Sequence, residues 1–166
     1  MCLYLLLHPY RSESVLAVVR GTTACQRQFI NNLKDYVEGD CNPAHFFDWE
    51  PSFDQLEITQ SLFPHLVAHL PAFTNITFVT LVLDVPGVSI AHLEGSTLNC
   101  WKLDALRLEA REPRRVTAEE ICAFACNCFR PNWPGLTLEL RGPITLVGGP
   151  ALVELAFMFC EVIRTP

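Results

Sequence analysis

Four short segments of this chain share one apolar spacing, which recurs along the chain. In each segment, two residues separate the first apolar residue from the second, and one residue separates the second from the third. The segments span 53–58, 78–83, 103–108 and 133–138. Their middle residues, Leu56, Leu81, Leu106 and Leu136, lie 25, 25 and 30 residues apart. Recurrence at intervals of about 20 to 50 residues is typical of repeat architectures.

These segments and the residues between them predict alternating strands and helices. We expect strands at about 54–58, 78–84, 103–109 and 136–140; the brevity of 78–84 and its content of Val, Thr and Phe favour a strand over a helix. Between them, an apolar stripe predicts a helix at 60–70, and Val88–Leu93 predicts a short helix or irregular turn. Thr117 and Glu120 form a capping-box signature that opens a helix reaching about 129. Such short strands need neighbours, and stacked parallel copies with outer helices would share one core.

The sequence therefore favours an α/β fold, a short solenoid of parallel strands and outer helices. A compact α+β single domain is the alternative. The length suits one domain over 1–166, with 1–50 as an N-terminal cap or flanking region, 53–140 as the repeat and 151–163 as an apolar C-terminal capping helix. Within 1–50, the runs Leu3–Leu7 and Val15–Val19 fit strands or buried helix turns. Thr22 and Thr23 cap an expected helix at 24–37, in which Phe29, Ile30, Leu33 and Val37 fall at helical spacing.

On these motifs the chain resembles the leucine-rich-repeat family, particularly the irregular type that follows the F-box in F-box proteins. The resemblance covers about 53–140 and implies a concave, strand-lined surface that binds a protein. Two family features are missing. The family carries Asn or Cys two residues beyond the last strand leucine, where this chain has Gln60, Val85, Ala110 and Leu140. Nothing in 1–50 reads as an F-box.

Composition and charge narrow the classes of function. Half of the residues are hydrophobic, which is enough for a sizeable core. The net charge of −6 argues against binding the phosphates of nucleic acids, and no run of about 18 apolar residues predicts a membrane span. The apolar start, 1–7, is not preceded by a basic residue, so it does not read as a signal peptide. With eight cysteines in no repeating framework, we expect an intracellular protein, cytoplasmic or nuclear, with reduced thiols.

Matching the strands at their middle leucines predicts which side chains share the face opposite the leucines. One column holds Thr59, Asp84, Glu109 and Glu139, and a second holds Glu57, Val82, Arg107 and Thr137. Parallel neighbours lie about 4.8 Å apart, so the first column would be an acidic ladder that repels itself. Such a ladder predicts a basic protein partner; alternatively, these are strand-end residues splayed into water. The predicted binding residues are Glu57, Thr59, Asp84, Arg107, Glu109 and Glu139.

No motif in the chain assembles a catalytic or metal site. The cysteines 122, 126 and 128 lack a second ligand pair for zinc, and His65 and His69 lack the glutamate of a zinc-protease motif. We therefore expect no metal and no cofactor. The predicted function is a non-enzymatic protein-interaction module. The alternative is a small α/β enzyme or ligand-binding domain whose site joins distant groups such as Cys41, His45 and Asp48.

Overall fold

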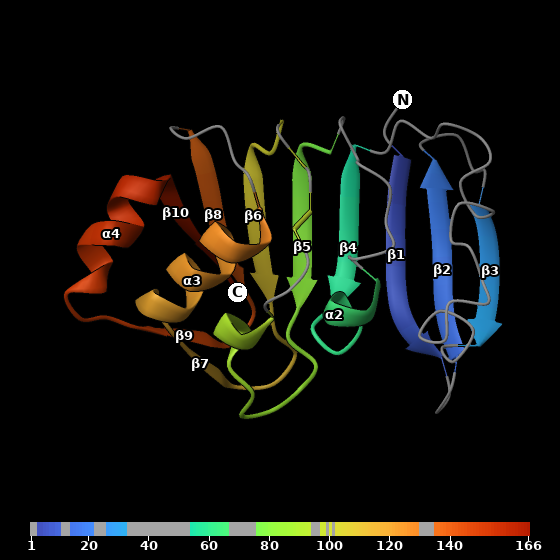
Figure 1. The fold of residues 1–166 in the computed structure, drawn as a ribbon, viewed down its shortest axis with the longest axis horizontal. Coiled ribbons are helices and arrows are strands. Elements are labelled where there is room, and N and C mark those ends of the chain that lie inside the picture. Colours follow the sequence, from blue (N-terminus) through green and yellow to red (C-terminus); the bar gives the residue numbers. More distant parts are fainter. Residues whose placement is uncertain are drawn as a thin grey trace.

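The structure, a computed structural model, describes part of the chain (Figure 1). Residues 3–10, 14–21, 26–32 and 65–66 are described as backbone, and 54–64, 76–93, 97–98, 100, 102–129 and 135–166 with side chains. This covers the four predicted strands and most of the elements between them.

The fold is a mixed α/β structure built on an eight-stranded sheet. Its order is β10-β8-β6-β5-β4-β1-β2-β3, and the five pairings from β10 to β1 are all parallel. The strands β2 and β3 extend this sheet by antiparallel pairing. The bounds are β1 Leu3–Tyr10, β2 Ser14–Gly21, β3 Gln26–Asn32, β4 Gln55–Thr59, β5 Phe78–Val82, β6 Ala105–Glu109, β8 Leu136–Arg141 and β10 Phe159–Thr165.

The described helical elements lie on one side of the sheet (Figure 1). These are α2 (Phe63–Leu66), the 3-10 helix η3 (Ile90–His92), α3 (Ala118–Cys128) and α4 (Ala151–Met158), which lies at the β10 end. A second, two-stranded parallel sheet joins β7 (Arg114–Thr117) to β9 (Ile144–Val147). No helix in the described part of the chain is long and apolar enough to cross a membrane.

The core lies between the sheet and these helices. Strand side chains two residues apart, such as Leu106 and Leu108, are fully buried there, as the repeated spacing predicts. Phe124 of α3 packs edge-on against Phe63 of α2 and against Phe129, with ring centroids 5.3 and 5.4 Å apart. The side chains between the buried ones alternate to the other side of the sheet, which carries the charged residues of these strands together with Phe78, Val82 and Ala105.

Equivalent backbone hydrogen bonds recur where successive parallel strands end. Each joins the residue after one strand to the last residue of the next, and the donors are 23, 27 and 32 residues apart. The bonds run from Gln60 N–H to Val82 O (2.8 Å), Leu83 N–H to Glu109 O (2.8 Å), Ala110 N–H to Arg141 O (3.1 Å) and Gly142 N–H to Thr165 O (3.1 Å).

Several sequence predictions are confirmed. The four predicted strands are β4, β5, β6 and β8, and both N-terminal apolar runs are strands, β1 and β2. The capping box exists: Glu120 N–H donates to Thr117 Oγ1 (3.1 Å), and Thr117 N–H donates to Glu120 Oε2 (2.8 Å). The expected short helix after β5 is η3. Of the helix predicted at 60–70, α2 is described, and 67–70 lie outside the described residues.

Two helix predictions are wrong. The residues expected as a helix at 24–37 contain strand β3, because seven residue pairs with β2 outweigh the helical spacing. The expected C-terminal helix at 151–163 ends at Met158, and Phe159 begins β10, which pairs with β8. There Val162, Ile163 and Thr165 are β-branched, which favours the strand.

Candidate functional site: the polar face of the parallel sheet

The sheet face opposite the helices carries the predicted binding residues of the strands. We call the side chains of β4, β5, β6 and β8 that point away from the core the polar face. In the described part of the chain, no helix lies on this face (Figure 1). Its members are Gln55, Glu57, Thr59, Phe78, Thr80, Val82, Ala105, Arg107, Glu109, Thr137, Glu139 and Arg141.

The strand register corrects the predicted columns. The middle leucines do not align: Leu56 pairs with Val79, and Leu106 pairs with Leu138. The predicted register was therefore wrong by two residues at β5 and β8. One row across the sheet is Glu57, Thr80, Arg107 and Glu139, and the next is Thr59, Val82, Glu109 and Arg141.

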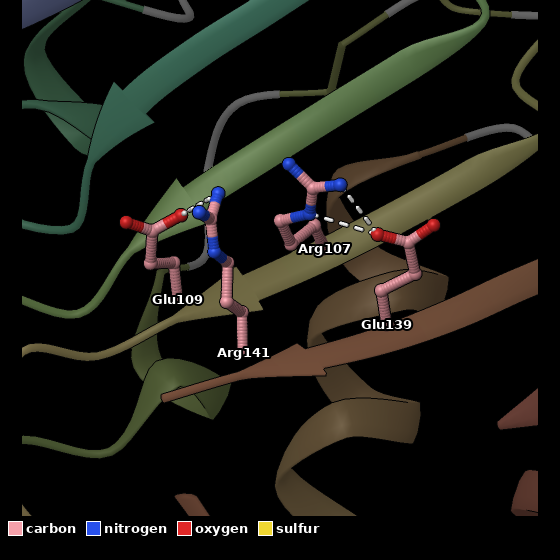
Figure 2. Close-up of polar contacts among 4 residues, drawn as sticks. All are labelled: Arg107, Glu109, Glu139 and Arg141. Carbon is pink, nitrogen blue, oxygen red and sulfur yellow. Dashed lines mark hydrogen bonds and ion pairs between the residues drawn. The ribbon is translucent and has the colours of Figure 1, made fainter. Parts of the chain in front are cut away.

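The predicted acidic ladder consequently does not form. Arg107 Nε and Nη2 both contact Glu139 Oε2, at 2.8 and 2.7 Å, and Arg141 Nη1 lies 3.5 Å from Glu109 Oε2 (Figure 2). A two-residue shift leaves the same side chains buried, so apolar periodicity fits both registers equally. Charge separates the two, because opposite charges attract across neighbouring strands and like charges repel.

These ion pairs are partly shielded from solvent. The side chains of Arg107 and Glu139 are 28% and 19% exposed, and the Arg107 guanidinium lies over the Phe78 ring, 4.6 Å from its centroid. Arg141 and Glu109 are more open, at 52% and 26%. Thus Arg107 is fixed from two sides, whereas the pair nearer the strand ends is freer to exchange its partner.

Two predicted binding residues do not share this arrangement. Thr59 shares a row with Glu109, as predicted, but its side chain is buried (2% exposed), which makes it a poor contact residue. Asp84 lies beyond the end of β5, and its carboxylate accepts hydrogen bonds from the backbone N–H (2.9 Å) and the hydroxyl of Ser61. Asp84 therefore joins the residues that follow two neighbouring strands.

A cavity of about 660 Å³ lies at this carboxyl end of β4, β5 and β6, and sequence reasoning missed it. Arg114 lines the cavity and donates from Nη1 to Val85 O (2.7 Å) and from Nη2 to Val88 O. The buried Gln60 amide also donates to Val88 O (3.0 Å), so both side chains hold one loop. The ionisable residues lining the cavity are Asp84, Arg111, Glu112, Arg114, Arg115 and Glu120.

Arg111, Arg114 and Arg115 all line that cavity, but its charge is balanced. Three arginines face three carboxylates, so net charge favours neither an anion nor a cation. The position of these residues in the sequence could have indicated the cavity, because loops that follow neighbouring parallel strands meet at one edge of a sheet.

The cysteines and histidines do not form a metal site among the described residues. Cys122 and Cys128 are buried and Cys126 is exposed, and Cys128 Sγ lies 3.1 Å from the carbonyl of Leu93. Burial raises the pKa of the Cys100 thiol to about 12, so this thiol is inert at neutral pH. Cys41, His45 and Asp48, which the sequence offered as an alternative site, lie outside the described residues, as does His69.

Comparison of the chain with protein-family models, curated proteins and solved structures found no match.

Proposed function

We propose that this protein is a non-enzymatic interaction module that binds a partner protein through the polar face. The observation that carries the proposal is the division of the sheet. One face is buried by helices, and the other displays ion pairs on rigid parallel strands without a described helix over it. Binding surfaces built on regular elements hold their side chains in place, which limits the entropy lost on association.

The wider architecture that fits this function is a short solenoid similar to leucine-rich repeats. The recurring strand-end hydrogen bonds support it, since each parallel strand joins the next at an equivalent position. Gln60 supports it too. This residue lies two positions beyond Ile58, where the family places Asn, and its buried amide donates to a carbonyl 28 residues further along the chain. Extension of the sheet by antiparallel β2 and β3 departs from that family.

The polar face also indicates what kind of partner it fits. Its ionised side chains are Glu57, Arg107, Glu109, Glu139 and Arg141, three acids and two bases. Because the acidic ladder is absent, the reason for a purely basic partner is weakened. A partner surface with alternating charges would complement the two neighbouring ion pairs better.

Site-specific photocrosslinking tests this proposal. A photoreactive residue at Thr137, on the polar face, should trap a specific protein in cells. The same residue at Asn127, exposed on α3, should not trap that protein, because α3 lies on the opposite side of the sheet. Equal capture at both positions, or capture only at Asn127, would contradict binding through the polar face.

The cavity at the strand ends favours a second candidate, a small-molecule binding site. Its volume of about 660 Å³ suits a drug-sized ligand, and the carboxyl edge of a parallel sheet is where such ligands bind. Arg111 and Arg115 are exposed there. A thermal-shift screen should find compounds that stabilise the wild type but not the Arg111→Ala/Arg115→Ala variant. Equal stabilisation of both proteins would argue against a ligand held by these arginines.

A further inference from the structure

Strand β10 forms one end of the eight-stranded sheet. Among the described residues it pairs with β8 alone. A bulge interrupts its register at Cys160, after which 161–165 pair regularly. In the described part of the chain no strand pairs with the outer side of β10, and natural proteins normally protect such an edge.

An apolar surface lies beside that edge. We call Leu152, Val153, Phe157 and Val162 the α4–β10 patch; their exposed fractions are 43%, 61%, 80% and 39%. Val88 is the one other large apolar residue exposed in the described part of the chain, so this exposure is concentrated rather than scattered. A phenylalanine side chain offers about 200 Å², so Phe157 alone exposes roughly 160 Å². Such concentration marks an interaction surface.

The patch lies on the helix side of the sheet, at the end that β10 forms. Val162 is aligned with the buried Leu138, which places it on the helix side of the sheet, the side on which α4 also lies. A strand added to β10 would therefore gain backbone hydrogen bonds from the edge and apolar contact from the patch together. Two-fold pairing of identical chains satisfies both requirements, because it presents the same edge and the same patch from each side.

The charges of β10 restrict how two such strands can pair. An antiparallel register centred on Glu161 or on Arg164 would place like charges directly opposite, which is destabilising. A register centred on Ile163 would bring two isoleucines together on the polar face, away from the patch, because Ile163 is aligned with Glu139. Centring on Val162 brings two valines of the patches directly opposite each other. We propose that two copies of this chain associate through antiparallel β10 strands centred on Val162, with their α4–β10 patches in contact.

Measurement of molar mass against concentration tests the association. Sedimentation equilibrium of the purified full chain should show a monomer–dimer equilibrium. Phe157→Glu should raise the dissociation constant at least tenfold, because it buries a charge in the contact. Val88→Glu is the control, since Val88 is an exposed apolar side chain (44%) that is not part of the patch, and it should leave the constant unchanged. A wild-type monomer at all concentrations, or equal effects of both substitutions, would overturn the proposal.

Disulfide crosslinking tests the register. Under mild oxidation Val162→Cys should form a covalent dimer linked through residue 162, identified by mass spectrometry of the linked peptides. Arg164→Cys should not link to itself, because residue 164 lies four positions from its counterpart in this register. Efficient linkage of residue 164 to its own counterpart, or a dimer that never links through 162, would overturn the proposed pairing.

Discussion

Breaking the Arg107–Glu139 ion pair tests the strand register, on which the geometry of the polar face depends. A double-mutant cycle uses Arg107→Ala, Glu139→Ala and the double variant. The cycle isolates the energy between the two side chains from what each contributes alone. Stacking of Arg107 on Phe78 is lost whenever Arg107 is replaced, so it cancels from the coupling.

The structure sets the size of this coupling. Two guanidinium nitrogens of Arg107 contact one carboxylate oxygen of Glu139 at 2.8 and 2.7 Å, which is a closer contact than a loose surface ion pair makes. However, the side chains are 28% and 19% exposed, so water still screens the charges. Exposed pairs contribute about 0.2–1 kcal/mol and hydrogen bonds to charged groups about 1.5–3 kcal/mol. We expect a coupling of about 1 kcal/mol in low salt, and less in 1 M salt.

Chemical denaturation of the four proteins measures it, as free energies of unfolding at one temperature. The control is the cycle between Arg107 and Thr137, which the register matched at the middle leucines would place opposite each other. The observed register predicts no coupling there beyond about 0.3 kcal/mol. If Arg107 and Glu139 proved additive while Arg107 and Thr137 were coupled, the register and the ion pairs derived from it would be refuted.

Three further predictions concern the core and the turns. Phe124→Ala should lower the free energy of unfolding by about 3–5 kcal/mol in urea denaturation, because this fully buried ring packs against two others; a loss below 1 kcal/mol would contradict that packing. Gly142→Ala should cost about 3 kcal/mol in the same assay, since its φ of 81° disfavours a side chain and a Cβ would lie 2.1 Å from the Ala110 carbonyl oxygen; unchanged stability would contradict this turn. Burial raises the pKa of Cys100 to about 12 and of Cys122 to about 11 from 9.0, so their contribution to stability is complete below pH 9 and lost as the pH rises towards 12. Denaturation between pH 7 and 11 should show a steeper fall for the wild type than for Cys100→Ala, and parallel curves would contradict it.

Local patterns in the sequence located most of the elements that build the site. The repeated apolar spacing marked the four central strands, because each needs two buried side chains on one face. Thr117 and Glu120 fixed the start of α3, since both halves of a capping box lie within four residues. Such signals depend on neighbours in the chain, so sequence alone is sufficient to read them.

The wrong helix predictions concern segments whose secondary structure is decided by residues far away in the sequence. Helical spacing at Phe29, Ile30 and Leu33 suggested a helix, but the edge of β2 offered hydrogen bonds that this segment satisfies as a strand. The C-terminal helix prediction failed in the same way, because β10 forms against β8, whose residues lie more than 20 positions earlier. An apolar run indicates that a segment is buried, but it does not indicate which element packs against that segment.

The register of the polar face was predictable in principle from charge. Shifting β8 by two residues against β6 keeps the apolar pattern and brings Glu139 opposite Arg107 and Arg141 opposite Glu109. Applying opposite-charge pairing as a second criterion would have chosen this register. The cavity at the strand ends offered no such criterion, because its shape depends on how the loops around Val85 and Arg114 fold together.

Binding of the crosslinked partner to a charge-swapped protein tests the central claim most directly. In Arg107→Glu/Glu139→Arg the ion pair is kept with its direction reversed, so the melting temperature should change by no more than about 3 °C, the shift expected for 1 kcal/mol in a domain of this size. If the partner reads the polar face, its dissociation constant, measured by titration calorimetry, should rise at least tenfold. A folded charge-swapped protein that binds the partner as tightly as the wild type would show that the polar face is not the binding surface.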